Sequence, residues 1–155
     1  MSMILIAIST WLHTLATIVM VGYYLFTGLV FLPVLERKTH GTDLRDFLKG
    51  VSSQIRPYFG GALLVFIVTG TYLMLINENY LGLGHFFGNP WSALIVVKHV
   101  IVVAFVFLGI RAERIYAVKI SDDKPEILQQ YRLSLYGNLA LGMLILLLTT
   151  IAQAI

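Results

Sequence analysis

Residues 3–35 read MILIAISTWLHTLATIVMVGYYLFTGLVFLPVL, and no aspartate, glutamate, lysine or arginine interrupts them. As an α-helix this stretch would be roughly 50 Å long, more than the hydrocarbon core of a bilayer at about 30 Å. Pro33 is expected to kink its last turn. Three further apolar runs, at about 58–76, 91–110 and 133–155, are also long enough to cross. The sequence therefore predicts four transmembrane helices.

The composition agrees with an integral membrane protein of one domain, residues 1–155. Of the 155 residues, 58% are hydrophobic and only 12% are charged, about half the charged fraction of a soluble domain. This balance excludes a soluble enzyme, a nucleic-acid binder and a disordered chain. Because there is no cysteine, disulfides, thiolate metal sites, iron–sulfur clusters and covalently attached haem are excluded as well.

The basic residues predict how the spans are oriented. Five follow the first span (Arg37, Lys38, Arg45, Lys49, Arg56) and five follow the third (Arg111, Arg114, Lys119, Lys124, Arg132), while residues 77–90 and both termini have none. By the positive-inside rule the first and third loops are cytoplasmic, and both termini lie outside. We expect an all-α, up-down four-helix transmembrane bundle in the plasma membrane of a bacterium or archaeon.

The first loop contains a weakly amphipathic stretch and a proline. Residues 43–51 are expected to form a short, separate cytoplasmic helix. Pro57 immediately precedes the second apolar run, and proline suits the first turn of a helix. The second transmembrane helix is therefore predicted to begin at about residue 58.

Two histidines, His13 and His99, fall inside predicted spans. An ionisable side chain within a membrane is costly and is a functional hypothesis by default. His13 lies roughly 15 Å after Met3 and His99 roughly 12 Å after Trp91 along helices that run in the same direction. The two histidines are thus expected at one depth, in the outer half of the bilayer.

The first and third spans are diagonal partners in an up-down bundle, so the two imidazoles can face each other. This arrangement predicts bis-histidine ligation of one b-type haem, with His13 and His99 as axial ligands. Simple hydrogen bonds between helices, a different metal and a proton relay remain as alternatives.

Other polar residues near the histidines are candidates for cofactor binding. Thr17 and Tyr24 share the helical face of His13, and Thr69 lies on a polar face of the second span; such groups can bond histidine Nδ1 or the cofactor. Lys98 adjoins His99 and either pairs with a haem propionate or extends to the outer interface.

Three sequence features resemble a known family: Trp11-Leu12-His13, the segment Gly28-Leu29-Val30-Phe31-Leu32-Pro33, and Trp91 followed by Lys98. With four spans, the chain resembles the CopD/HemJ-like group of small membrane proteins. The resemblance implies a haem-binding or copper-resistance protein in which His13 is a ligand and Lys98 a functional residue. It also implies two activities, HemJ-like protoporphyrinogen oxidation and CopD-like copper transport.

The function that the sequence favours is a membrane b-type cytochrome. It would exchange electrons with a quinone or a redox protein, as a homodimer or a subunit of a larger complex. Copper is the less favoured cofactor because the five methionines form no cluster. Whether the chain catalyses a reaction is left open, and a purely structural membrane subunit is a further alternative.

Overall fold

The computed structural model describes residues 2–38, 41–82, 84–85, 87–120 and 124–155. The first helical rod consists of α1 (Met3–Phe26), a π-helical turn η1 (Thr27–Phe31) and α2 (Leu32–Glu36). The second is α3 (Gly41–Leu75). The third consists of α4 (Pro90–Arg111), η2 (Ala112–Tyr116) and α5 (Ala117–Lys119), and the fourth is α6 (Pro125–Ala154). All four rods contain a segment long and apolar enough to cross a membrane, which confirms the all-helical, four-helix prediction.

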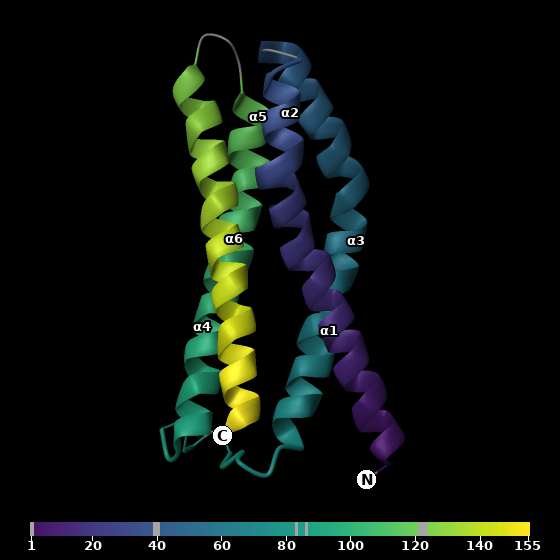
Figure 1. The fold of residues 1–155 in the computed structure, drawn as a ribbon, viewed down its shortest axis with the longest axis vertical. Coiled ribbons are helices and arrows are strands. Elements are labelled where there is room, and N and C mark those ends of the chain that lie inside the picture. The colour runs from purple at the N-terminus through teal and green to yellow at the C-terminus, as the bar shows by residue number, and fades with distance from the viewer. Residues whose placement is uncertain (1, 39–40, 83, 86, 121–123) are drawn as a thin grey trace.

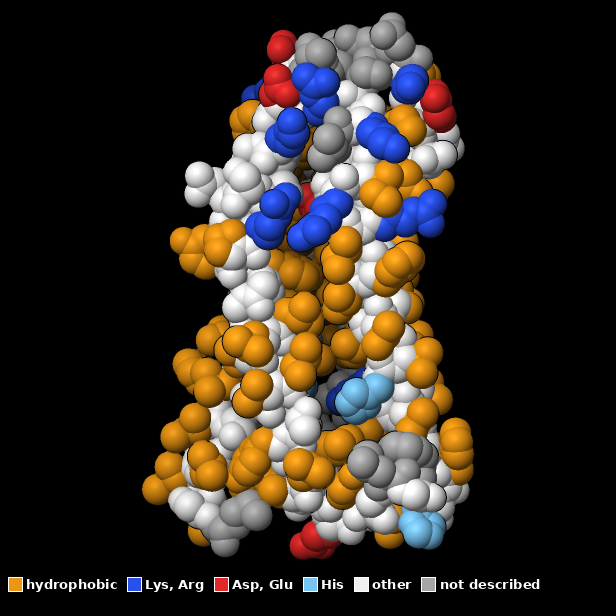
Figure 2. Space-filling view, turned by 180° about the vertical axis from the view of Figure 1, so that it is seen from behind, with side chains coloured by type: hydrophobic (Ala, Val, Ile, Leu, Met, Phe, Trp, Pro, Cys, Tyr) orange, Lys and Arg blue, Asp and Glu red, His pale blue; other side chains and the backbone are white. Residues whose placement is uncertain are grey.

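The rods pack as two hairpins. The first hairpin joins the α1–η1–α2 rod to α3, and the second joins the α4–η2–α5 rod to α6. The two hairpins meet mainly where α1 and η1 lie against α6, so α1 and α4 are on opposite corners, as the sequence predicts (Figure 1). Both chain ends lie at the end of the bundle opposite α2 and α5. We call the half with α2 and α5 the basic half, because its surface carries most of the lysines and arginines (Figure 2), and the other the histidine half.

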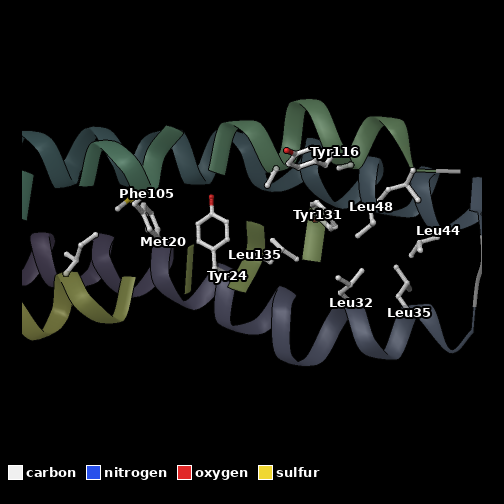
Figure 3. Packing of buried hydrophobic residues seen from close by; sticks show 14 of the residues in the cluster. Met20, Tyr24, Leu32, Leu35, Leu44, Leu48, Phe105, Tyr116, Tyr131 and Leu135 are labelled. Atoms are coloured by element: carbon white, nitrogen blue, oxygen red, sulfur yellow. The ribbon is translucent and has the colours of Figure 1, made fainter. Parts of the chain in front are cut away.

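The hydrophobic core is concentrated in the basic half. Its largest fully buried side chains include Tyr24, Phe105, Tyr131 and Leu135, contributed by three of the four rods (Figure 3). Tyr24 packs edge-on against Phe105, with ring centroids 5.1 Å apart. A Cβ atom at Gly109 would collide with the Tyr24 hydroxyl, so only glycine lets these helices approach.

The buried side chain of Asn138 joins the two helices of the second hairpin. Its side chain is fully buried, and its amide donates to the Phe105 carbonyl at 2.9 Å and accepts from the Gly109 N–H at 3.0 Å. These are the two backbone groups that ordinarily bond each other in a helix. The asparagine therefore bridges α6 to the backbone of α4, a strong constraint because buried polar groups require partners.

Two predictions about helix boundaries were wrong. The second helix begins at Gly41, so residues 43–51 are the first turns of α3 and Pro57 lies inside it. The missing N–H of Pro57 costs roughly 3 kcal/mol in a helix interior. The burial of Leu44 and Leu48 in the core offsets this cost and keeps the helix continuous. Likewise, α6 begins at Pro125 rather than near residue 133, because Ile127, Leu128 and Tyr131 pack on the core.

The first rod contains a π-helical turn, η1, shortly before Pro33, where the sequence predicts a kink. The π-helical turn spans Thr27–Phe31 and ends just before the proline. Because Pro33 cannot donate a hydrogen bond to the carbonyl four residues earlier, the ladder must rearrange there. Gly28 in this turn lies against Leu135 and Tyr136 of α6.

Candidate functional site

His13 lies between α1 and α3, held by three neighbours on one face of α3. Its Nδ1 is 3.0 Å from Thr69 Oγ1, and its ring stacks on Phe66 with centroids 4.4 Å apart. A Cβ atom at Gly70 would come within 2.8 Å of His13 Cε1, so the absence of a side chain there makes room for the imidazole. The predicted hydrogen bond between a polar residue of the second span and histidine Nδ1 is thus present at Thr69.

The hydrogen bonds determine which nitrogen of His13 carries the proton. The Thr69 hydroxyl donates to the Val65 carbonyl at 2.6 Å, so its oxygen is left to accept from His13. Nδ1 is therefore a donor, and in the neutral imidazole Nε2 keeps its lone pair. This is the tautomer that a metal ligand requires when Nε2 is the ligating atom.

His99 on α4 also carries a proton on Nδ1, but a different kind of group accepts it. Its Nδ1 lies 2.7 Å from the backbone carbonyl of Ile95, one turn earlier in the same helix. Because a carbonyl can only accept, Nδ1 must donate, and in the neutral imidazole Nε2 is then the nitrogen with a lone pair. In the neutral form, both histidines thus present an unprotonated Nε2.

His99 lines an apolar pocket of about 320 Å³ between the end of α3, the following loop and α4. Its walls include Met74, Tyr80, Trp91, Ile95 and Val96. Met74 is one helical turn from Gly70, which touches His13. The α3 residue beside His13 and the α3 residue in the His99 pocket are therefore roughly 6 Å apart along the helix axis, by the helical rise. Figure 2 shows histidine and basic side chains together at a hollow between two helices.

Lys98 also belongs to this region. It is half-buried and lies close enough to His13 for the two side chains to interact electrostatically. No carboxylate among the described residues forms an ion pair with it. A half-buried ammonium without an acidic partner is a suitable binding group for an anion.

The other two predicted site residues have different positions. Thr17 is buried, and its hydroxyl donates to the His13 carbonyl at 2.8 Å, so it stabilises the helix beside the histidine. Tyr24 lies eleven residues beyond His13, roughly 16 Å along the helix, within the core of the basic half. The structure therefore places Lys98 within electrostatic reach of His13 and beside His99 in the chain, and it leaves Tyr24 in the core of the basic half.

Sequence reasoning missed Phe66 and Gly70, which shape the surroundings of His13. Their spacing from Thr69 was the available signal, because residues 66, 69 and 70 share one face of a helix. Among the described residues, no group of three or more His, Cys, Asp or Glu could hold a bare metal ion. Haem differs in this respect, because the porphyrin supplies four of the six iron ligands.

A second polar group connects the two hairpins in the basic half. The Tyr23 hydroxyl donates to Glu113 Oε1 at 2.6 Å, and the Tyr131 hydroxyl approaches the same oxygen at 3.5 Å. Nearby, Arg132 donates to Glu36 at 2.6 Å. Both connections join the α1–η1–α2 rod to the second hairpin.

Comparisons with known proteins do not assign the chain to a family. No family model matches the sequence, and neither a curated protein nor a solved structure matches it. The resemblance to CopD/HemJ-type proteins therefore remains a prediction.

Proposed function

We propose that the protein is a membrane b-type cytochrome that holds one haem between α1 and α4, with His13 and His99 as axial ligands. One observation carries this proposal. In the neutral form, each histidine donates its Nδ1 proton to a fixed acceptor, Thr69 Oγ1 or the Ile95 carbonyl, which leaves Nε2 as the unprotonated nitrogen. A structural histidine between helices needs only one such bond, whereas a ligand pair needs two free nitrogens at a similar depth.

Two features of the surroundings support the proposal. The pocket of about 320 Å³ beside His99 offers apolar walls to part of a porphyrin, and Lys98, next to His99 in the chain, would be a cation for a propionate. Thr69 and the Ile95 carbonyl would hold the imidazoles in position, and Phe66 would limit rotation of the His13 ring. A haem held by these two histidines would supply one-electron chemistry.

The charge distribution supports an orientation and a partner class. The basic half faces the cytoplasm of a bacterial or archaeal plasma membrane, and the histidines lie in the outer half. A single haem at that depth cannot carry electrons across the bilayer alone. Its electrons would be exchanged with a quinone in the membrane or with a redox protein at the outer surface.

The test is the absorption spectrum of the purified protein, oxidised and then reduced, after expression with ample haem. We expect a Soret band and sharp α and β bands of a six-coordinate b haem. His13→Ala and His99→Ala should each change or abolish these bands, while His85→Ala, at an exposed loop residue, should not. A colourless wild-type protein contradicts haem binding, and an unchanged spectrum in both span variants contradicts the ligand assignment.

A further inference from the structure

The helices α3 and α4 border a groove that is open to the outside of the bundle. Each packs on a different partner, α3 on α1 and α4 on α6. Val103 and Phe107 of α4 are 69% and 67% exposed. By the helical repeat they lie within about 20° of Val96, which lines the pocket between the two helices. Figure 2 shows a groove between two helices, with hydrophobic side chains on both sides and Lys and Arg side chains at its upper end.

Two arginines lie at the basic end of this groove. Arg56 is 18 residues before Met74 in α3, and Arg114 is 18 residues after Val96 in the α4–η2–α5 rod. Met74 and Val96 line one pocket, and 18 residues are five whole turns, roughly 27 Å. Because the two helices are antiparallel, the two arginines come to about the same level on facing walls. The packing of α5, which follows Arg114 closely, against α3 agrees with this level.

The two arginines are available to an anion. Both are exposed, and neither belongs to an ion pair among the described residues. Glu113 directly precedes Arg114, but its carboxylate accepts the hydrogen bond from Tyr23 at 2.6 Å, between the two hairpins. Guanidinium groups match the geometry of phosphate oxygens with paired hydrogen bonds. Arg56 and Arg114 therefore form a suitable pair for a phosphate group.

The groove continues from the arginines into an apolar wall. Phe107 and Val103 are seven and eleven residues from Arg114, on the same side of the rod. On the opposite wall, Gly60 lies one turn from Arg56, and a Cβ atom there would meet nothing within 4 Å, so this wall leaves space. The hydrocarbon of one leaflet is roughly 15 Å thick, which corresponds to about ten residues of helix. An acyl chain whose phosphate lies at the arginines would extend past Phe107 to about the level of Val103.

We propose that the groove between α3 and α4 binds one anionic phospholipid of the cytoplasmic leaflet. Its phosphate lies between Arg56 and Arg114, and an acyl chain lies along Phe107 and Val103. The occupant is a lipid because the cationic end of the groove leads directly into its apolar wall, which matches a head group joined to a hydrocarbon chain. This inference does not depend on the haem site. It adds a lipid that fills the space between the two hairpins.

The test is quenching of tryptophan fluorescence in lipid nanodiscs. Phe107→Trp places a fluorophore on the groove wall, whereas Trp11 and Trp91 lie toward the other end of their helices and give a constant background. Phospholipids brominated in the acyl chains are added at low mole fraction to unlabelled phosphatidylcholine. Brominated phosphatidylglycerol should bind at least about fivefold more tightly than brominated phosphatidylcholine, the effect expected of one basic residue beside an anionic lipid. Val103→Trp, a second probe position, should report the same preference.

The matched variants remove the same charge at two places. Arg56→Gln with Arg114→Gln should abolish the preference for phosphatidylglycerol. Arg37→Gln with Lys38→Gln, exposed residues of the first rod, should retain it. Arg56→Lys with Arg114→Lys should also retain it, because the charges remain. Three results overturn the proposal: equal quenching by both lipids with all arginines present, an equal loss in the two glutamine pairs, or a loss in the lysine pair.

A soluble anion distinguishes a lipid from a free phosphate. Glycerol 3-phosphate at millimolar concentration, compared with sodium chloride of equal ionic strength, should leave the quenching by phosphatidylglycerol unchanged, because it lacks the acyl chain that contacts Phe107. Displacement of the brominated lipid by glycerol 3-phosphate overturns the lipid as the occupant.

Discussion

The basic half and the histidine half of the same bundle are built on different principles. The basic half is closed by large side chains, such as Tyr24, Phe105 and Tyr131, that fill the space between three rods. The histidine half contains an apolar pocket beside His99, and the bond between His13 and Thr69 lies within the first hairpin. Packing in the basic half stabilises the fold, whereas the histidine half retains a cavity. Substitutions in the first should change stability, and substitutions in the second should change ligand binding.

The largest loss of stability is expected from Gly109→Ala. The new Cβ would collide with the Tyr24 hydroxyl, and overpacking of this kind costs roughly 1–3 kcal/mol. The free energy of unfolding in detergent measures the effect. Gly60→Ala, where a Cβ meets nothing, is the control and should be neutral or slightly stabilising because alanine favours helices. Equal stability of the two variants would show that Tyr24 and Phe105 do not hold the closed half together.

A similar substitution in the histidine half should have a different result. Gly70→Ala places a Cβ against His13 Cε1, so the ring must rotate away from Thr69. We expect about 1–2 kcal/mol of destabilisation from local overpacking and, in addition, loss of the six-coordinate spectrum. Gly61→Ala on the same helix, where a Cβ has open space, should preserve both. Retention of the full spectrum in Gly70→Ala would contradict the role of this face of α3.

Thr69→Val tests the hydrogen bond alone, since valine keeps the shape of threonine. Without the acceptor, His13 Nδ1–H loses its fixed partner, and loss of such a support to a metal ligand typically weakens binding about 10- to 100-fold. A titration of the apoprotein with haem measures this change. The exposed Thr71→Val is the control. An unchanged affinity would mean that Phe66 and Gly70 position His13 without Thr69.

Much of the fold could be predicted because long apolar runs favour long helices. Apolar runs predicted four helices, and the diagonal relation of α1 and α4 followed from antiparallel order. The predicted starts of the second and fourth helices were wrong, because these helices begin at residues 41 and 125, outside the apolar runs. There the helices continue because Leu44 and Tyr131 are buried against other rods, and contacts between distant segments are not visible in local hydropathy.

The candidate site was predictable only in its unusual residues. His13, His99 and Lys98 stand out because ionisable groups are rare in spans. Phe66 and Gly70 are ordinary residues of an apolar helix, and their importance depends on the rotation of α3 toward α1. Tyr24 shares a helical face with His13, but residues on one face can be far apart along the helix. The distance between Tyr24 and His13 along the axis places Tyr24 in the core rather than beside the histidine.

The smallest effect is expected from Glu36→Gln, which removes the ion pair between the hairpins. The Arg132 side chain is 42% exposed, so the pair is screened, and such pairs contribute about 0–1 kcal/mol. The second oxygen of Glu36 is buried without a hydrogen-bond partner among the described residues, and its desolvation offsets part of even this gain. Thermal unfolding should therefore shift little, and any shift should shrink as salt is added. A large loss of stability, independent of salt, would mean that the ion pair rather than the packing around Tyr24 closes the basic half. The contrast between the two halves would then depend on a polar contact that a single proton could break.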